Sequence, residues 1–378
     1  MDTRSLNYQI IRKVSYPALA LLLCCACSYL CAAEHPCDPS PPYGFVCGPR
    51  NAEDLVLIPD TKWIIASGME KGASLYLIDT EHKTWSILYP GESPKARQNM
   101  ALYGVCPGPP DPDNFISHGL NIRRDSNGHS TLYVVSHGGR EAIEVFDVDP
   151  SGTSPSITWT GCVMMPDGLD ANSVASFSDG SLVTTVLVRP GKTYRDAFAL
   201  EPTGAVYEWS PGDSGFTLVA GTELSANNGI EVAADEREIY VVSPTLRMAV
   251  AFSRSNPARR LRTSRQLPFG PDNIHMGSNG RLITAGMVIE DPVCGSPPSA
   301  QDFEGREPGE VFAEYISCHR GVIVAELDPR TLQDAELIRG PADGNFSNAT
   351  MALQVGNEIW IGTFSGDRIG YLKLKPSK

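Results

Sequence analysis

The chain has 378 residues, a formal net charge of −13 at pH 7 and a hydrophobic fraction of 42%, which is ample for one large core or two smaller ones. Proteins that bind nucleic acid need a basic stripe, and because this acidic sequence contains none, it argues against a nucleic-acid partner. Its charge fits the binding of cations better.

The first 33 residues differ in composition from the rest of the chain. Arg4, Arg12 and Lys13 precede the apolar run ALALLLCCACSYLCAA, and polar, proline-rich sequence follows it. The run is shorter than the ~20 residues of a membrane-spanning helix, so residues 1–33 resemble a cleaved secretory signal peptide. A retained anchor and lipidation of a cysteine are the alternatives. We expect a secreted or extracytoplasmic protein that associates with a membrane only through an uncleaved N-terminal segment.

Six cysteines follow residue 33, and an even number suits disulfide bonding in an oxidising compartment. They are Cys37, Cys47, Cys106, Cys162, Cys294 and Cys318. Cys294 and Cys318 bracket a Pro- and Gly-rich insertion, which favours pairing them first and Cys37 with Cys47 next, although the sequence alone fixes no connectivity. Zinc ligation is the alternative, but no C-x-x-C spacing among these six supports it.

One phrase recurs six times along the chain: small or polar residues, an alternating strand, a turn such as Pro59-Asp60, and a second β-rich strand. The copies begin at residues 53, 118, 172, 228, 272 and 348. A third strand follows each copy, a fourth follows most, and the longest step contains an insertion at 288–320. This pattern is typical of a β-propeller. The sequence therefore predicts an all-β, six-bladed β-propeller with four strands per blade, forming one domain over residues 34–378.

The two ends of this domain complement each other. The last copy lacks a fourth strand, whereas residues 34–52 precede the first copy and have no blade of their own. Closure of the ring by this N-terminal segment would leave no open edge. We recognise no amphipathic helix of 10 or more residues after residue 33, which argues against a doubly wound α/β fold.

The first strand of each propeller blade lines the central channel, so equivalent residues of the six copies form a ring at one mouth of that channel. The ring is polar: Glu53, Asp54, His118, Asn172, Asn228, Asp272, Asn273, Ser347 and Asn348. Five members offer the carboxylate and amide oxygens that Ca²⁺ takes: Glu53, Asn172, Asn228, Asp272 and Asn273. Mg²⁺ demands stricter octahedral geometry, and zinc prefers His or Cys. The alternative is that these residues are turn formers bonded to nearby backbone.

The chain resembles the paraoxonase/arylesterase family, within the wider six-bladed calcium propellers that include the gluconolactonase and regucalcin group. The resemblance lies in EDLVLIPDTKWIIASGM, HGLN with LYVVSHGG, DANS, ANNGIEV, DNI and IWIGTF, in the same order over nearly the whole mature chain. It implies that the five oxygen-bearing residues bind a catalytic calcium, and that Asp54 and the backbone of Leu120 help hold a second, structural calcium. The family usually has an Asp where this chain has Ser173, and Asp170 is the candidate substitute. The family's membrane-associating helices are not evident.

His118 and His137 are the candidate catalytic pair. They lie 19 residues apart on a predicted hairpin, which can bring the two imidazoles together, and imidazole is suited to take a proton from water at neutral pH. The resemblance implies that His118 is the base and that His137 orients it, while calcium polarises the carbonyl. The chain has no G-x-S-x-G elbow. The prediction is a calcium-dependent hydrolase of small-molecule lactones or aryl esters.

Two alternatives stay open, because a fold does not choose its chemistry. One is a sugar-lactone hydrolase or another small-molecule enzyme on the same fold, and the other is a non-catalytic, secreted calcium-binding scaffold. The His118/His137 pair discriminates between them, since a scaffold has no need of it. Met69 and the insertion 288–320 are predicted to wall or cover the pocket, unless the insertion covers only the outer edge of blade five. His275, near Asn273 on one strand, is left unassigned.

Overall fold

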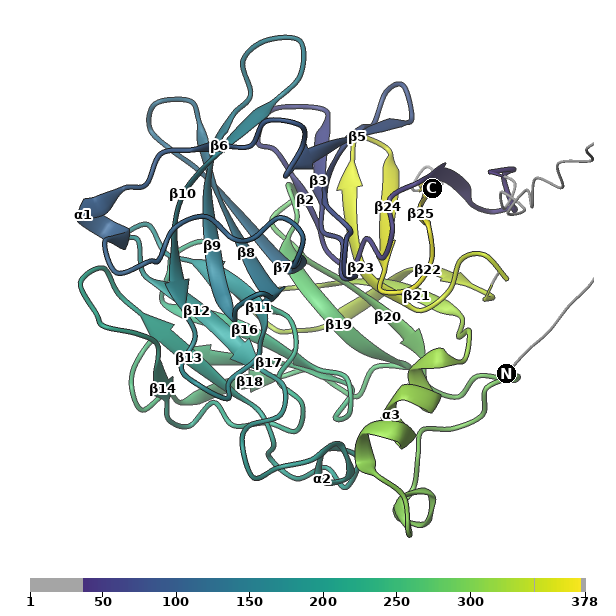
Figure 1. Ribbon diagram of the computed structural model, residues 1–378. Helices are drawn as coiled ribbons and strands as arrows, with labels where there is room; N and C mark the ends of the chain where they lie inside the picture. Colours follow the sequence, from purple (N-terminus) through teal and green to yellow (C-terminus); the bar gives the residue numbers. More distant parts are fainter. Residues whose placement is uncertain (1–36, 343, 375–378) are drawn as a thin grey trace, which may run out of the picture. The chain divides into compact units, whose positions relative to one another are not determined.

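The computed structural model describes residues 37–342 and 344–374, so the predicted signal peptide or anchor at 1–33 lies outside the described residues. The described part forms six antiparallel sheets arranged as a β-propeller (Figure 1). The predicted all-β fold and the count of six blades are therefore confirmed. Each blade has four antiparallel strands, and blade 2 carries a short fifth strand at its edge.

The blades follow one another along the chain. Blade 1 comprises β2 (Leu55–Leu57), β3 (Trp63–Ala66), β4 (Leu75–Asp79) and β5 (Thr84–Tyr89); blade 2 comprises β7 (Phe115–Arg124), β8 (Ser130–Gly138), β9 (Ala142–Asp149) and β10 (Ser156–Met164), with β6 (Lys95–Ala96) parallel to β10. Blade 3 comprises β11 (Ala171–Ser176), β12 (Leu182–Val186), β13 (Ala205–Trp209) and β14 (Thr217–Val219).

The second half of the ring repeats this order. Blade 4 comprises β15 (Ile230–Val232), β16 (Glu238–Ser243), β17 (Met248–Ser253) and β18 (Arg260–Thr263); blade 5 comprises β19 (Phe269–Met276), β20 (Leu282–Val288), β21 (Val322–Leu327) and β22 (Asp334–Gly340). Blade 6 comprises β23 (Ala349–Val355), β24 (Glu358–Thr363), β25 (Arg368–Lys373) and β1 (Gly44–Cys47).

Ring closure occurs in blade 6, as predicted. β1 pairs antiparallel with β25, in a register that places Phe45 opposite Gly370 and Val46 opposite Ile369. The N-terminal segment thus supplies the strand that the last sequence repeat lacks, and it covers the edge of β25 that would otherwise be free. In blade 1, the predicted turn at Pro59-Asp60 is present, and Asp60 adopts a positive φ of 59°.

Apolar side chains fill the space within and between the blades. The largest cluster joins blades 1, 2 and 3 and includes Phe146 and Trp159, while a second joins blades 5, 6 and 1 and includes Trp360. These side chains are at most 1% exposed. The alternation of apolar residues along each strand therefore builds a ring in which every blade is held by its neighbours.

Between residues 37 and 374, the described part of the chain has four short helices outside the blades: α1 (Met100–Tyr103), α2 (Tyr194–Phe198), the 3₁₀ helix η1 (Ala300–Phe303) and α3 (Pro308–Ser317). The prediction that no helix of 10 or more residues occurs is wrong, because α3 has 10 residues. It begins with Pro308 at its first position, where the missing N–H costs nothing. No helix among the described residues is long and apolar enough to cross a membrane.

Three disulfides tie the described chain: Cys37–Cys47, Cys106–Cys162 and Cys294–Cys318. Both predicted pairs are present, and the remaining two cysteines pair with each other. Disulfides of this kind are typical of an oxidising, extracellular compartment. The first bond holds the closing strand β1, the second joins the segment after α1 to β10, and the third closes the base of the insertion in blade 5.

Removal of the Cys106–Cys162 bond is expected to cost more stability than removal of Cys37–Cys47. The two bonds close segments with sequence separations of 56 and 10 residues, and a longer closed loop restricts the unfolded chain more. Chain entropy gives about 4 kcal/mol for the first bond and about 3 kcal/mol for the second. Urea unfolding of the two double Cys→Ala variants measures the difference, and a reversed ranking would contradict this account.

Candidate metal and catalytic site

The predicted ring residues converge on one cavity of about 550 Å³. Glu53 of blade 1, His118 and His137 of blade 2, Asn172 of blade 3, Asn228 of blade 4 and Asp272 of blade 5 all line it. They come from five blades and are separated by up to more than two hundred residues of chain. The repeat thus placed these six side chains together, although the roles assigned to them remain predictions.

Interruptions of strand pairing aim the ring side chains into the channel. The pairing register shifts between Ser117 and Leu120 in β7, between Ala171 and Val174 in β11, and between Pro271 and Ile274 in β19. In each strand two unpaired residues lie between these points, and the ring residues His118, Asn172, Asp272 and Asn273 are among them. Irregularities of this kind re-aim side chains at functional sites. The sequence repeat predicts where these residues lie, but not the bulges.

Threonine hydroxyl groups on the second strands satisfy the backbone at these bulges. Thr184 donates to the carbonyl oxygen of Ser173 at 2.8 Å, and Thr284 donates to that of Asn273 at 2.6 Å. Thr185 reaches the next blade and donates to the carbonyl of Asn228. All three threonines are fully buried. They replace the ladder hydrogen bonds that a regular strand would have made, and so fix the ring backbone.

Close approach of neighbouring blades requires a residue without a side chain beside the ring. A Cβ on Gly229 would lie 2.6 Å from the carbonyl oxygen of Asp272 and 2.7 Å from the Cα of Asn273. The Gly229 N–H donates to the same carbonyl oxygen at 2.8 Å. Because residue 229 is glycine, blade 4 can bring Asn228 close to Asp272 and Asn273 of blade 5.

Three oxygen atoms at the ring are buried and have no hydrogen-bond partner: Glu53 Oε2, Asn172 Oδ1 and Asn228 Oδ1. They come from three different blades and line the same cavity. Unpartnered buried oxygens are costly. Carboxylate and amide oxygens that converge with no hydrogen-bond donor bound to them have the chemistry of a calcium site. The residues present therefore fit a Ca²⁺ ion.

Two carboxylates of the ring, the buried Glu53 and the half-buried Asp272, reinforce this fit. Burial, with the nearby charges of Asp54 and Asp272, raises the pKa of Glu53 well above its ordinary value. Burial raises the pKa of Asp272 to about 7, against the lowering effect of a hydrogen bond from Asn228 and together with the charge of Asp54. A cation between these groups would remove the repulsion that shifts them.

Asn273 lies one layer away from the cavity. Its amide nitrogen donates to Glu53 Oε1, and its side chain is buried. It does not line the cavity with the other ring residues. In this arrangement Asn273 orients Glu53 and compensates one of the carboxylate oxygens, while the other oxygen remains unpartnered.

The set predicted for a second calcium does not fit an ion. Asp54 Oδ2 accepts a hydrogen bond from the Leu120 N–H at 2.7 Å, so the Leu120 backbone faces Asp54 as a donor. Asp54 Oδ1 accepts from the Leu55 N–H at 2.8 Å and contacts His275 Nε2 at 2.9 Å. Both carboxylate oxygens are therefore already bonded. Asp170, the candidate substitute for the missing Asp, is exposed at the cavity, whereas Asp54 has no exposed surface.

His275 takes the place of a cation beside Asp54. Its Nδ1 lies 3.4 Å from Glu231 Oε2, so the imidazole lies between two carboxylates. Burial alone would lower the pKa of His275, but the charge and hydrogen bond of Asp54, together with Glu231, raise it to about 10. The sequence analysis left His275 unassigned. The structure places it as the partner of the acid for which a second metal was expected.

The two predicted catalytic histidines contact each other. His118 Nδ1 lies 3.0 Å from His137 Nε2, and His118 Nε2 lies 3.7 Å from Glu53 Oε2. On the far side, His137 Nδ1 lies 2.7 Å from Glu141 Oε2, a contact that the sequence analysis missed. Burial and the neighbouring His137 hold the pKa of His118 well below its ordinary value. His118 is therefore neutral at pH 7, as a base must be.

A lid of helices covers the cavity. Helices α2 and α3 lie next to each other (Figure 1). Tyr194 of α2 stacks on Phe312 of α3 with ring centroids 3.9 Å apart, and Phe198 packs against Tyr315 at 5.3 Å. These four aromatic side chains line the cavity, as do Met69 and the insertion residues Pro297 and Pro298. The prediction that Met69 and the insertion wall the pocket is confirmed, and the insertion does more than cover the outer edge of blade 5.

A buried arginine anchors this lid. Arg320 is 1% exposed and donates to the carbonyl oxygens of Ile289 and Gly295, each at 2.9 Å. Its guanidinium lies 4.4 Å from the centre of the Tyr315 ring. The ring residue Asn348 serves the lid as well, because its amide donates to the carbonyl of Ile316 at 2.9 Å and accepts from the Arg320 N–H at 2.8 Å.

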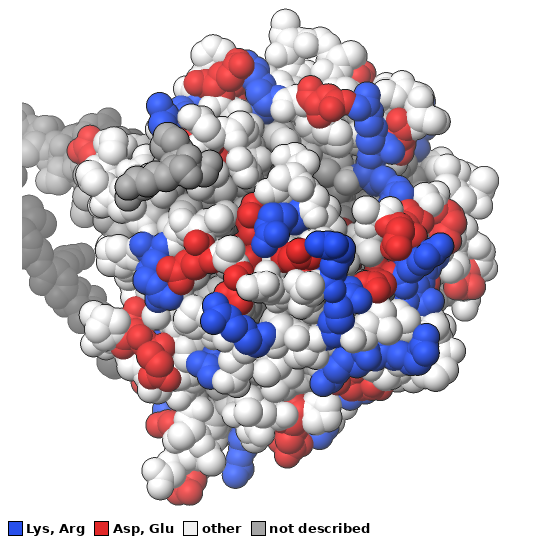
Figure 2. Space-filling model, turned by 180° about the vertical axis from the view of Figure 1, so that it is seen from behind, with Lys and Arg blue, Asp and Glu red and all other residues white. Residues whose placement is uncertain are grey.

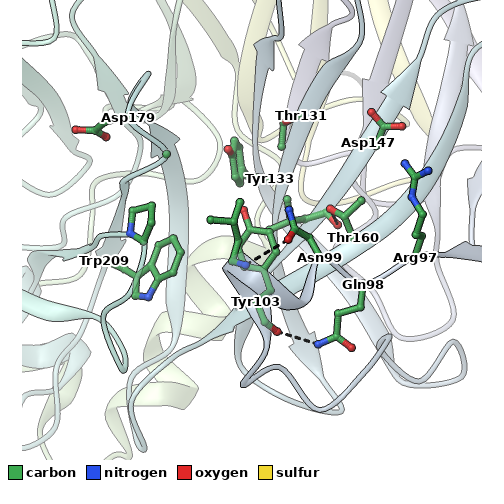
Figure 3. Close-up of a pocket in the computed structure, with 14 residues that line it drawn as sticks. Arg97, Gln98, Asn99, Tyr103, Thr131, Tyr133, Asp147, Thr160, Asp179 and Trp209 are labelled. Carbon is green, nitrogen blue, oxygen red and sulfur yellow. Dashed lines mark hydrogen bonds between the residues drawn. The ribbon is translucent and has the colours of Figure 1, made fainter. Parts of the chain in front are cut away.

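Other features lie apart from this site. A cavity of about 510 Å³ outside blades 2 and 3 is lined by Tyr103, Tyr133 and Trp209 and by no ring residue (Figure 3).

A second group of metal-ligating residue types lies on the outside of blade 1 and consists of Asp79, Glu81 and His82. The Lys62 ammonium already pairs with the two acids of this group, at 3.3 and 2.6 Å. Figure 2 shows acidic and basic side chains interspersed on the face seen from behind.

No protein-family model matches the sequence, and no curated protein matches it either. Solved structures do match. A luciferin-regenerating enzyme is 12% identical, with a TM-score of 0.50 over 88% of this chain and 94% of that chain. A candidate gluconolactonase is 11% identical, with a TM-score of 0.51 over 89% of this chain and 93% of that chain. The chain shares the fold of these six-bladed propellers.

A third match is regucalcin from Agrobacterium tumefaciens strain C58, which is described as a calcium-binding protein. It is 11% identical, with a TM-score of 0.49 over 86% of this chain and 91% of that chain. Likeness at such low identity shows the fold alone, because propellers carry many chemistries on one architecture. The activity of this chain must therefore be argued from its own site.

Proposed function

We propose that the protein is a calcium-dependent hydrolase of apolar lactones and aryl esters, related in mechanism to the paraoxonase/arylesterase family that its sequence resembles. One observation carries the proposal. Three unpartnered buried oxygens from three blades lie in the same cavity as a hydrogen-bonded pair of histidines. A calcium site that served stability alone would need the oxygens but not the adjacent base.

The ion would be held by Glu53, Asn172, Asn228 and Asp272. Asn273 would orient Glu53 through its hydrogen bond to Oε1. When bound, calcium supplies a Lewis acid that polarises a carbonyl and stabilises the negative charge that develops on its oxygen. His118 accepts the proton of the attacking water at Nε2, the nitrogen that points away from His137 toward Glu53. No serine nucleophile takes part. We propose a single ion, since the residues around Asp54 are already bonded.

The wall of the cavity favours an apolar substrate. Its aliphatic and aromatic lining residues include Leu187, Val188, Tyr194, Phe198, Phe312 and Tyr315. The lining also includes Asp170, Thr245, Arg247 and Glu290, but most of it is apolar. Most hydroxyl groups of a sugar lactone would therefore face apolar side chains, and an unmet polar group costs affinity. A carbonyl attached to an aliphatic chain or an aryl group would bury its apolar part under the lid. The apolar lactone is therefore favoured over the sugar lactone.

A substrate panel tests this function. Purified protein is assayed on an alkyl δ-lactone, phenyl acetate and gluconolactone, before and after treatment with EGTA and after calcium is returned. The expected result is hydrolysis of the first two substrates that disappears with EGTA and returns with calcium. Preference for gluconolactone would support the sugar-lactone alternative. Calcium-dependent thermal stability with no hydrolysis of any substrate would support the scaffold.

A further inference from the structure

We propose that Glu141 is a positioning residue for this reaction: it fixes the tautomer of His137, and through it that of His118, and it gives the proton a way out of the cavity. The inference rests on the proposed function for its catalytic consequence, but its structural content does not. It starts from a line of four groups, Glu53, His118, His137 and Glu141, joined at 3.7, 3.0 and 2.7 Å.

The protons on the two imidazoles follow from the end of this line. An ionised carboxylate only accepts hydrogen bonds, so His137 donates from Nδ1 to Glu141. Neutral His137 then has its lone pair on Nε2, and it accepts a hydrogen bond from His118 Nδ1. His118 Nε2 is left without a proton, toward the oxygen ring. This is the tautomer that a general base needs.

The local backbone brings Glu141 back onto His137. Gly138 has a φ of 92°, and a Cβ there would lie 1.9 Å from the carbonyl oxygen of Asn114, so only glycine makes this turn. The carbonyl of Glu141 accepts from the Met165 N–H at 2.9 Å, which fixes the end of the turn. The carboxylate four residues after His137 is thereby directed at its ring.

Glu141 is not neutralised by its basic neighbour. Arg140 donates from Nε and Nη2 to the two oxygens of Glu144, at 2.7 and 2.8 Å. Among the described residues, His137 is the one side chain that contacts the Glu141 carboxylate. The Glu141 carboxylate is therefore free to accept the His137 proton without competition from an arginine for the same oxygens.

His137 also lies between two cavities. It lines the ring cavity, and it lines a second cavity of about 320 Å³ together with Phe115, Arg140 and Met164. The Glu141 side chain is 31% exposed. The line of groups therefore leads from the buried base to a carboxylate in contact with solvent, on the side of His137 away from the substrate.

The proton transfer along this line balances. His118 Nε2 takes a proton from water, whose oxygen bonds to the substrate carbonyl carbon. The proton on His118 Nδ1 passes to His137 Nε2, and the proton on His137 Nδ1 passes to a Glu141 oxygen, from which solvent removes it. Each imidazole gains one N–H bond and loses one, so neither keeps a charge. The protons then return along the same line when the leaving group needs one.

The tautomers of the two histidines test the proposal without any substrate. In ¹⁵N NMR spectra of the histidine side chains, wild-type protein is expected to carry protons on Nδ1 of both His118 and His137. Glu141→Ala is expected to shift His137, and with it His118, toward the other tautomer. Glu141→Gln, whose amide oxygen still accepts from Nδ1, is expected to keep the wild-type pattern. Unchanged tautomers in Glu141→Ala would overturn the proposal.

Kinetics test the catalytic consequence. In an active enzyme, Glu141→Ala is expected to lower kcat about 10- to 100-fold with KM and calcium affinity unchanged, whereas the matched control Glu92→Gln, an exposed loop residue, leaves kcat as it is. Glu141→Gln should recover part of kcat, since it orients His137 but takes no proton. Wild-type kcat in Glu141→Ala would overturn the positioning role, and wild-type kcat in Glu141→Gln would overturn the proton exit.

The two kinds of failure are distinguishable. If no lactone or ester is hydrolysed under any condition, the proposed function fails, and the NMR result still decides whether Glu141 sets the tautomers. If the substrates are hydrolysed but the Glu141 variants behave as wild type, the proposed function stands and this inference fails. Circular dichroism of Glu141→Gln, which keeps the shape of the side chain, shows whether a loss of activity reflects loss of the fold.

Discussion

Replacement of Asp272 by alanine is expected to abolish calcium binding and, with it, hydrolysis of lactones and phenyl acetate. Asp272 is one of the two carboxylates proposed to bind the ion, and the other, Glu53, would be left with the amide oxygens of Asn172 and Asn228 alone. Two positive charges opposite one carboxylate are poorly compensated. A Lewis acid contributes several kcal/mol to such a reaction, so kcat/KM should fall by about a thousandfold or more. Calorimetric titration with calcium and steady-state assays measure the two losses.

The folded state is expected to survive this change. Asp272 is half-buried at the cavity near other carboxylates, and without an ion its negative charge opposes folding. The calcium-free Asp272→Ala protein should therefore melt no lower than calcium-free wild type. The exposed Asp167 offers a matched control, since Asp167→Ala should bind calcium and turn over as wild type. Full turnover of wild-type protein after verified removal of calcium would contradict the metal mechanism altogether.

Replacement of His118 by glutamine is expected to lower kcat by a factor of about 10² to 10⁴, the usual contribution of a general base, while calcium affinity stays within about twofold. Glutamine has a similar length and can still donate to His137, but its amide does not take a proton from water. His118 is not among the oxygen donors of the ring. Parallel measurements of kcat and calcium affinity on the same preparation separate the two effects.

The third histidine in blade 2 serves as the control for this variant. His129 lies in the turn region before β8, 2.9 Å from Asp147 and outside the cavity. His129→Gln should therefore leave both kcat and calcium affinity unchanged. If His118→Gln turned over at the wild-type rate, the base would have to be another group, and the assignment of His118 would be wrong.

The sequence was sufficient to predict the architecture because each copy of the repeat corresponds to one folded sheet. Each blade buries one alternating set of side chains, so six copies of one pattern mark six sheets. The alignment of the six copies also predicts the site, since residues at equivalent positions in a closed ring of blades meet near its axis. Glu53, Asn172, Asn228 and Asp272 could be selected in this way although no local motif marks any of them, and the structure brings them to one cavity.

Features that depend on contacts between distant segments could not be predicted in this way. His275 pairs with Asp54 across 221 residues of chain, and nothing near either residue indicates that an imidazole occupies the place expected for an ion. Glu141 is different, since a carboxylate four residues after His137 in a tight glycine turn is visible in the sequence. The signal was present there and was not used.

The helix α3 was missed for a related reason. Its amphipathic spacing is short and is diluted by acidic residues, with Val311 and Phe312 on one turn and Tyr315 and Ile316 on the next. Ten residues carry a weak periodic signal, and short helices are marginal without tertiary contacts. The helix gains its stability from the aromatic stack with α2 and from the Arg320 anchor, both of which belong to the folded state.

The pairing of β1 with β25 limits when the propeller can close during synthesis of the chain. Strand β1 cannot pair until β25 has been synthesised, because Phe45 in β1 lies opposite Gly370 in β25. Throughout translation the nascent polypeptide thus carries an unmatched β-edge, the kind of surface that promotes aggregation. Chaperones that shield such edges would be needed early in synthesis, and the need would end when β1 pairs with β25.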